Sequence, residues 1–460
     1  MRGKISVCII LAIGFLIFLI YGSSTIYGMR NDVIANEETI IGDVNAVSGV
    51  NIEVKYQDNN DIGWDINYQI ENNIQMSATF KTFYYNNYSN NFAPSVHLGT
   101  DMGLYREEYF GQIEGDVGEI TISLADKYEY MPINLFVSFD KSSSKGLLGE
   151  NNIYKIKMPE DAVLHIKKEY NSYSSEPINV PYIDARPPSV LIDGKMYLTI
   201  TNFLNQIYYE KSSEDNIEYT ITSGILAIED KERLSLDDIE MIYPIHLANG
   251  GTTTVLGLTS VKEEKFLALA TLEEQNIYIH LYDVKNNVLV KKEKVGSIPA
   301  NMIINQFNLI TQGDYLLANY VYDRKEETDS RDTLKAVGAA YNITDTNEIK
   351  NVFENEYYTK LAKEINEHYY TEPQDMLFKD NKLHMVFYNS NNDYYGRDRL
   401  NSIVLLTMDK EEIQYFGILR NSMIEDYTIG DVYQFQYTTN GDRLIIGNRA
   451  RNIYSFHFVK

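Results

Sequence analysis

The stretch NIYIHLYDVKNNVLVKKEKV, residues 276–295, indicates the fold class of this chain. Its first half alternates Ile277, Ile279 and Leu281 with polar or aromatic side chains, which is the period of a half-buried β-strand. Residues 285–287, Lys-Asn-Asn, form turns readily and are expected to send the chain back into a second strand. The stretch therefore predicts an antiparallel β-hairpin.

A weak internal repeat extends this pattern over the C-terminal half of the chain. Polar turns lead directly into apolar strands at residues 193–195, 263–265, 313–314, 380–382 and 440–443. One or two further strands are expected after most of them. Such a repeat resembles the blades of β-propeller proteins, with LYDVKNNVLVKKEKV similar to an outer hairpin and DGKMYLTI to an inner strand.

This resemblance implies a mainly β fold with a propeller-like domain of about five to six blades. It covers residues 189–460, and an irregular set of antiparallel sheets is the alternative. In its whole organisation the chain also resembles single-anchor ectodomain proteins of low-GC Gram-positive bacteria. That second resemblance implies a location and no activity.

Short strands are also expected between residues 46 and 170. The alternating apolar residues there are Val50, Ile52 and Val54; Trp64, Ile66 and Tyr68; and Ile120, Ile122 and Leu124. Residues 152–158 and 162–168 flank the turn Pro159-Glu160-Asp161 and are expected to pair as a hairpin. We predict a β-sandwich-like domain in this region.

Composition then divides the chain into six segments. They are a cytoplasmic tip (1–4), a transmembrane anchor (5–22), a stalk (23–45), the β-sandwich-like domain (46–170), a Pro- and Ser-rich linker (171–188) and the β-propeller-like domain (189–460). Outside the anchor a helix is expected at residues 356–370, where apolar residues recur three or four apart. A smaller one is expected at residues 235–242, where Ser235 could be the N-cap and Asp237 and Asp238 lie in the first turn.

The N-terminal segment ISVCIILAIGFLIFLIYG, residues 5–22, carries no charge. As a helix it would span about 27 Å, close to the roughly 30 Å hydrocarbon core of a membrane. Arg2 and Lys4 precede it and predict a cytoplasmic N-terminus with the remaining chain outside the cell. A cleaved signal peptide ending near Gly22 is the alternative.

The net charge of −24 excludes one class of partner. A surface of this sign repels phosphate backbones, so nucleic acid is not expected to bind. The single cysteine, Cys8, lies in the apolar segment, and hence no disulfide within the chain is possible.

Motifs for catalysis are weak throughout the sequence. Ser142 and Lys145 have the Ser-x-x-Lys spacing of penicillin-recognising enzymes, but they lie in a Gly- and Asn-rich loop. His280, His384 and His457 occupy alternating strands, where hydrogen bonding to a neighbour is the usual role. We therefore predict no catalytic residue and no cofactor. A structural calcium ion at the acidic turns 58–63 or 391–396 is left open.

Three functions remain open from the sequence. The first is a membrane-anchored extracytoplasmic binding or scaffold protein whose loops meet a protein, peptide or glycan. Its Tyr-rich loops 83–88 and 393–395 suit such contacts. The second is an accessory subunit of a membrane complex, and the third is a propeller-type carbohydrate-active enzyme.

Overall fold

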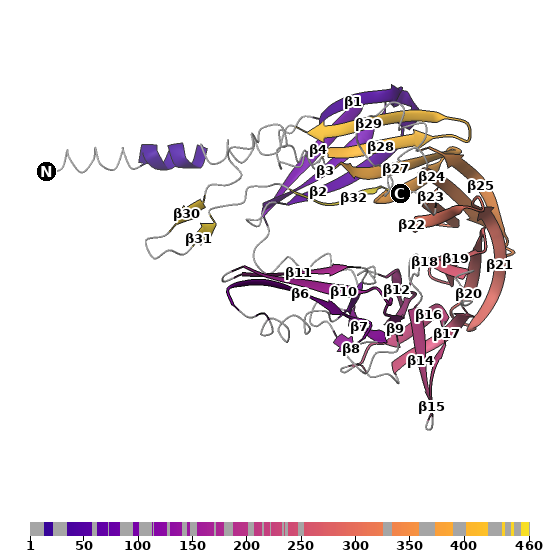
Figure 1. Cartoon of the computed structure of the whole chain (residues 1–460). Helices are drawn as coiled ribbons and strands as arrows, with labels where there is room; N and C mark the ends of the chain where they lie inside the picture. Colours follow the sequence, from indigo (N-terminus) through magenta and orange to yellow (C-terminus); the bar gives the residue numbers. More distant parts are fainter. Residues whose placement is uncertain are drawn as a thin grey trace. The chain divides into compact units, whose positions relative to one another are not determined.

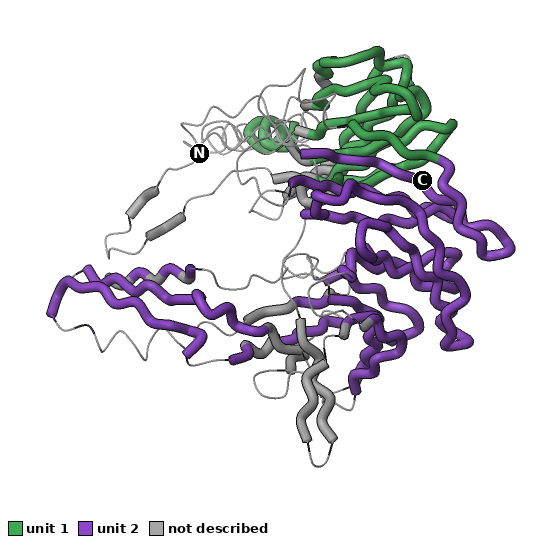
Figure 2. Tube along the Cα trace, turned by 45° about the vertical axis from the view of Figure 1, so that its right-hand side comes forward, with its two compact units in different colours: residues 1–90, 353–460 green, residues 91–352 purple. Residues whose placement is uncertain are grey.

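Antiparallel β-strands make up most of this chain in the computed structural model (Figure 1). The residues described are 13–21, 35–57, 62–71, 73–82, 95–100, 113, 115–126, 129–139, 145–147, 154–169, 172–178, 187–200, 207–213, 216–220, 222–231, 234, 238–246, 253–324, 334–357, 373–389, 402–421, 435–437, 443–445 and 452–459. The predicted mainly β class is confirmed. The chain divides into two compact units, residues 1–90 with 353–460 and residues 91–352 (Figure 2), and each is described by itself.

Residues 13–21 of the predicted anchor are helical. Every large apolar side chain in this helix is exposed, from 48% for Leu19 to 73% for Tyr21. Across the described residues, no helix reaches the length and apolarity that crossing a membrane requires.

The unit of residues 91–352 contains three sheets of four strands. The first has the order β12 (Ser189–Ile192), β13 (Lys195–Leu198), β16 (Thr222–Glu229) and β17 (Ile239–His246). The second has the order β18 (Thr253–Val261), β19 (Phe266–Glu273), β20 (Asn276–Asp283) and β21 (Val288–Ser297). The third has the order β22 (Met302–Gln312), β23 (Tyr315–Arg324), β24 (Lys335–Ile343) and β25 (Ile349–Glu356). The boundary between the two units falls within β25, after Val352. All their pairings are antiparallel between neighbours along the sheet.

The same unit contains two further sheets, formed by strands that come before β12 and by β14 and β15, which lie between β13 and β16 in the chain. A six-stranded sheet has the order β15 (Asn216–Thr220), β14 (Ile207–Ser213), β9 (Tyr154–Lys157), β7 (Tyr130–Ser138) and β5 (Ser95–Thr100), with β8 (Lys145–Leu147) also on β7. A three-stranded sheet has the order β11 (Ser172–Ile178), β10 (Val163–Glu169) and β6 (Val117–Ser123).

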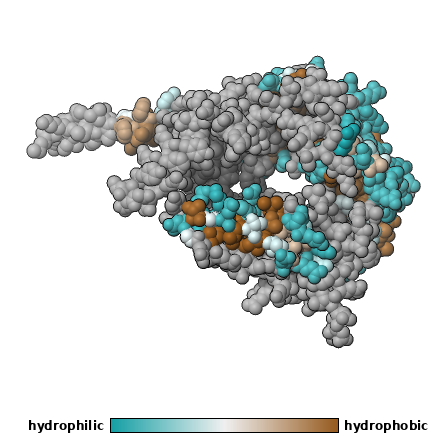
Figure 3. All heavy atoms as spheres, viewed as in Figure 1, coloured by the Kyte–Doolittle hydropathy of each residue, from teal (hydrophilic) through white to brown (hydrophobic). Residues whose placement is uncertain are grey.

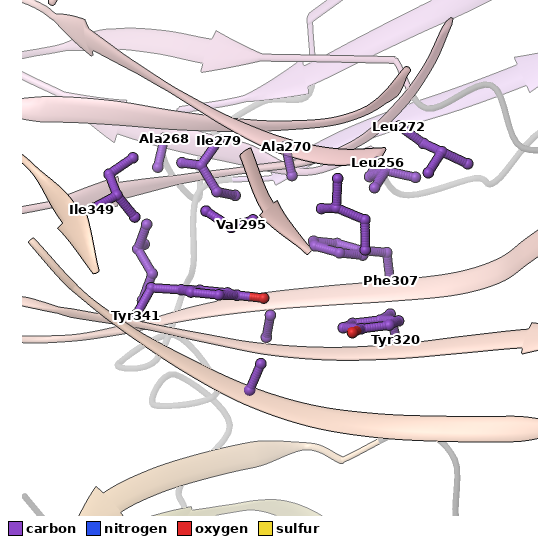
Figure 4. Close-up of a cluster of buried hydrophobic side chains, with 14 of the residues drawn as sticks. Leu256, Ala268, Ala270, Leu272, Ile279, Val295, Phe307, Tyr320, Tyr341 and Ile349 are labelled. Carbon is purple, nitrogen blue, oxygen red and sulfur yellow. The ribbon is translucent and has the colours of Figure 1, made fainter. Parts of the chain in front are cut away.

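The cores of this unit lie between successive sheets. The β18–β21 sheet packs on the β12–β17 sheet through one face and on the β22–β25 sheet through the other, which is why β19 is buried from Phe266 to Leu272. In Figure 4, Ala268, Ile279 and Leu256 face Phe307, Tyr320 and Tyr341 across the second of these cores. Phe307 and Tyr320 stack with ring centroids 6.1 Å apart. Burial of each such side chain contributes about 1.5–3 kcal/mol, so the repeat is stabilised sheet against sheet.

The other unit joins both ends of the chain. One sheet has the order β1 (Ala35–Gly42), β29 (Ile413–Asn421), β28 (Ser402–Met408), β27 (Lys382–Asn389) and β26 (Asp375–Lys379). The other has the order β32 (Asn452–Phe458), β2 (Val50–Gln57), β3 (Ile62–Ile70) and β4 (Ile74–Thr82), and a short helix η1 (Val44–Val47) precedes it. The two sheets share one core. A separate pair is formed by β30 (Phe435–Tyr437) and β31 (Arg443–Ile445).

The strand pairing differs from the predicted division at residues 46–170, 171–188 and 189–460. The last strand, β32, pairs with β2, so the predicted β-sandwich region and the C-terminal region contribute to one sheet. The predicted linker contains β11, which pairs with β10 along its whole length. Pro177 is accommodated in β11 because an edge strand tolerates proline, and the predicted division into domains stays a prediction.

Two local predictions were wrong. The turn at Pro159 forms, but β9 pairs with β7 and β14 while β10 pairs with β6 and β11, so the two strands are not a hairpin. The expected helix at 235–242 ends in strand β17 instead. The expected helix at 356–370 begins at Glu356, which is the last residue of β25, and residues 358–370 lie outside the described part.

The repeated polar turns are confirmed as hairpin turns. In the four sheets that contain β12, β18, β22 and β26, such a turn joins the first strand to the second. Asp193-Gly194 and Asp380-Asn381 have positive φ at both residues, the conformation of tight hairpin turns that Asp, Asn and Gly accept. The turn at 440–443 lies mostly outside the described residues.

Candidate functional site

The three histidines singled out in the sequence all lie in strands with a neighbour in reach. His280 is on β20 and 1% exposed, and His384 is on β27 and 3% exposed. His457 on β32 is half-buried, with Nε2 3.5 Å from Glu53 on the paired strand β2. Of these three histidines, only His280 contacts both a side chain of a second sheet and a member of a charged pair. We therefore take it as the centre of the candidate site.

Both ring nitrogens of His280 have partners. Nδ1 lies 2.9 Å from the hydroxyl of Tyr243 on β17, in the neighbouring sheet. Nε2 lies 2.9 Å from the hydroxyl of Thr271 on β19. The tilted rings of Tyr243 and His280 also touch, with centroids 5.8 Å apart. The histidine thus joins two sheets of one unit by a polar contact inside an apolar core.

A charged pair continues this network toward the end of β19. The Thr271 hydroxyl donates to Glu273 at 3.2 Å, and Lys292 on β21 donates to the other carboxylate oxygen of Glu273 at 2.7 Å. The Lys292 ammonium also lies 4.7 Å from the ring centre of Tyr278. Because Thr271 donates to Glu273, its oxygen accepts from Nε2–H, and Nδ1 accepts from the Tyr243 hydroxyl.

The surroundings keep His280 neutral. Burial, with a smaller effect of the Lys292 charge, lowers the pKa of His280 from 6.5 to about 4, although Glu273 opposes the shift. Burial also raises the pKa of Tyr243, and the nearby Glu273 adds to that shift. A neutral ring with both nitrogens occupied has no lone pair for a metal or a substrate proton. The arrangement therefore acts as a clamp between sheets and not as a general base.

His384 repeats part of this arrangement in the other unit. Its Nδ1 lies 2.8 Å from the hydroxyl of Thr407, directly across the β27–β28 ladder. Burial, then the charges of Lys382 and Lys379, lowers its pKa to about 3. Its ring meets the ring of Phe458 on β32 edge-on, with centroids 6.4 Å apart.

The remaining sequence candidates contribute little to this site. Lys145 lies in strand β8, whereas Ser142 lies outside the described residues. The acidic turns at 58–61 and 391–396 and the Tyr-rich loops 83–88 and 393–395 also lie outside them. Among the residues that are described, no group of three or more His, Cys, Asp or Glu side chains could hold a metal ion.

The side chains that contact His280 could not be identified from the sequence. Tyr243 is 37 positions away, on a strand that was expected to be helical in part. Thr271 and Glu273 lie on the preceding strand, where the alternation of side chains shows a face but not a partner. Only the pairing of β19 with β20 and the packing of β17 on them bring these residues together.

The long connections between strands lie at one end of their sheets. In a four-stranded antiparallel sheet, the connections from the first to the second strand and from the third to the fourth lie at one end. The connection from the second to the third strand, and the chain that leaves the fourth strand, lie at the other end. The first-to-second connections are short, at residues 193–194, 262–265, 313–314 and 380–381. In these four sheets the connections of ten residues or more are 199–221 (which contains β14 and β15), 325–334, 357–374, 390–401 and 422–434, and all of them follow a second or a fourth strand. The end of β19 that carries Glu273 belongs to this same end of the β18–β21 sheet.

Comparison with known proteins gives no family. No protein-family model matches the sequence, and no curated protein matches it. Solved structures with a similar arrangement include the Swd1 β-propeller domain of Myceliophteria thermophila, with 9% identity over 66% of this chain and 89% of that chain and a TM-score of 0.26. TolB from Acinetobacter baumannii has 10% identity over 88% and 81% and a TM-score of 0.24. At such scores the similarity supports no argument about this chain.

Proposed function

We propose that this chain is a membrane-anchored extracytoplasmic binding or scaffold protein whose sheets are blades of a propeller-like fold. In this proposal each unit contacts a partner through the long connections of its own sheets, and within the unit of residues 91–352 the clamp at His280 keeps neighbouring sheets in place. The observation that carries the proposal is that, within each of these sheets that has connections of ten residues or more, those connections follow the second or the fourth strand and so lie at the same end of that sheet. A rigid scaffold with variable loops on one side is a common design for binding proteins.

Two further features support this proposal. Successive four-stranded sheets pack face to face through apolar cores, as repeated blades do. The uncharged run of residues 5–22 and the exposed apolar side chains of residues 13–21 favour an anchor in lipid. An accessory role in a membrane complex would use the same anchor, and the partner would then be another membrane protein.

Site-specific photocrosslinking in cells tests the proposed binding end. A crosslinking residue replaces Tyr394 in the connection 390–401, and the matched control replaces Glu411 in the short connection 409–412 of the same sheet. The proposal predicts a discrete adduct from position 394 and none from position 411. Adducts from position 411 alone, or from neither position, would contradict it.

A further inference from the structure

Strand β21 presents an unusual edge of its sheet. It pairs with β20 on one side, and no described strand pairs with its other side. Three consecutive apolar residues at its start are exposed, Val288 at 50%, Leu289 at 36% and Val290 at 37%. Every second residue of an edge strand directs its backbone N–H and C=O away from the sheet, so such an edge can accept another strand.

The corresponding edges of other sheets in the chain are protected. The edge strand β17 contains the exposed residue Pro244, which has no N–H to donate. The edge strand β25 exposes Lys350, Asn351 and Glu354 in place of apolar residues. The fourth strand β29 is covered by an additional strand, β1. Only β21, among these four fourth strands, combines an open side with an exposed apolar run in the described residues.

The charged residues of β21 follow its apolar residues and give the two halves of the strand a different character. Lys291, Lys292 and Lys294 follow the apolar run, in a chain whose net charge is −24. Lys291 lies 3.0 Å from Glu293, and Lys292 pairs with Glu273, but the side chains of both lysines are more than a third exposed. Exposed pairs of this kind contribute about 0–1 kcal/mol and exchange partners easily. The edge is therefore apolar at its start and basic after it.

The order of acidic and apolar residues in β1 is one that would complement such an edge. β1, ANEETIIG, pairs antiparallel with β29, with Glu38 opposite Ile418 and Ile41 opposite Phe416. Its acidic residues come before its apolar residues. In antiparallel pairing with β21, a strand of this order would place its acids opposite the lysines and its apolar residues opposite residues 288–290.

We propose that β21 binds an extended segment of a partner protein as a fifth strand. The segment runs antiparallel to β21, carries acidic residues in its first half and apolar residues in its second, and forms main-chain hydrogen bonds along the edge. A second copy of this chain is the less favourable occupant, because β1 of each copy is held on its own β29, where Glu37 accepts the Tyr415 hydroxyl at 2.8 Å. This surface is separate from the loops of the proposed function and does not depend on them.

A peptide with the sequence of residues 35–42, capped at both ends and labelled with a fluorophore, is the probe. Its binding to the full-length chain is measured by fluorescence anisotropy at low and high salt. We expect binding that weakens with salt and falls about tenfold or more in the double variant Val288→Glu, Val290→Glu, which removes apolar contacts and adds negative charge at this edge. A peptide with both glutamates replaced by lysine should bind about tenfold more weakly than the original.

Val117→Glu is the matched control, because it adds a glutamate at an apolar residue that is 58% exposed on another sheet. It should bind the peptide as the unchanged chain does. Failure of the original peptide to bind at about 1 mM would overturn the proposal. Binding that the β21 variant leaves unchanged would also overturn it, since the peptide would then have displaced β1 from β29. A dimer of the chain that only the β21 variant dissociates would assign the edge to a second copy.

Discussion

The carboxylate of Asp375 accepts a hydrogen bond of 2.8 Å from the backbone N–H of Phe458. Asp375 begins β26 and Phe458 ends β32, so this bond joins the sheet of β26–β29 to the sheet of β32, β2, β3 and β4. Lys379 and Lys382 add bonds from the same hairpin to the carbonyl oxygens of Gly49 and Ala46, beside η1. The C-terminal strand is thus fixed by side chains as well as by its pairing with β2.

Replacement of Asp375 by Ala should loosen this strand. The N–H of Phe458 would lose its partner in a buried position, which costs about 1–3 kcal/mol. Hydrogen exchange measured by mass spectrometry should become faster in residues 452–458 and in β2. Asp375→Asn retains an oxygen acceptor and should recover part of the protection; equal exchange in all three proteins would show that the bond has no stabilising role.

Replacement of His280 by Gln should change how stability depends on pH. The unfolded chain binds a proton at this ring below pH 6.5, whereas the folded chain does so only near pH 4. Stability of the unchanged protein therefore falls as the pH drops from 6.5 to 4, by about 3 kcal/mol from this group, and no further below that. The variant lacks this contribution.

Denaturant unfolding at several pH values checks this expectation, because His384 titrates in both proteins and its effect cancels in the difference. The free energy of unfolding of the variant should lie below that of the unchanged protein at pH 7, and the gap should shrink by about 3 kcal/mol at pH 4. A gap that stays constant with pH would mean that His280 is protonated normally in the folded chain.

Replacement of Gly224 by Ala should be severely destabilising. Gly224 lies on β16 with φ of 151°, and a Cβ there would collide with the backbone carbonyl of Tyr243 on β17. We expect a loss of more than about 2 kcal/mol, since the paired strand and the His280 clamp beside it must shift. Gly194→Ala is the control: its φ is 77°, but its Cβ would meet open space, so only backbone strain of about 1 kcal/mol is expected. Thermal unfolding compares the two, and similar losses would contradict the packing argument.

The positions of many strands could be predicted from the sequence because their signals are local. Val50, Ile52 and Val54 alternate on β2 and are all buried, as expected. The polar turns that precede β13 and β27 have side chains that accept positive φ, so the positions of these turns could also be predicted. Local turn chemistry and side-chain period were sufficient for these features.

Pairing partners could not be predicted in the same way. Nothing in residues 50–57 indicates that they pair with residues 452–458, because that choice is made by packing over the whole unit. The helix expected at residues 235–242 rested on Ser235 as an N-cap and on the acids that follow it, which are local signals. Packing on two cores instead makes residues 239–246 the strand β17, with Met241 on one core and Tyr243 on the other.

The most direct test of the proposed location is cysteine labelling, which is practical because the chain has a single cysteine, Cys8, that can be replaced. With Cys8 replaced by Ser, a new cysteine is placed at Ser174, which is exposed on β11, or at the uncharged Gly3 before the apolar segment. Intact cells are treated with a thiol reagent that does not cross membranes. The proposed location predicts labelling of the Ser174→Cys protein in intact cells and of the Gly3→Cys protein only after permeabilisation. Labelling of Ser174→Cys only after the cells are opened would contradict it.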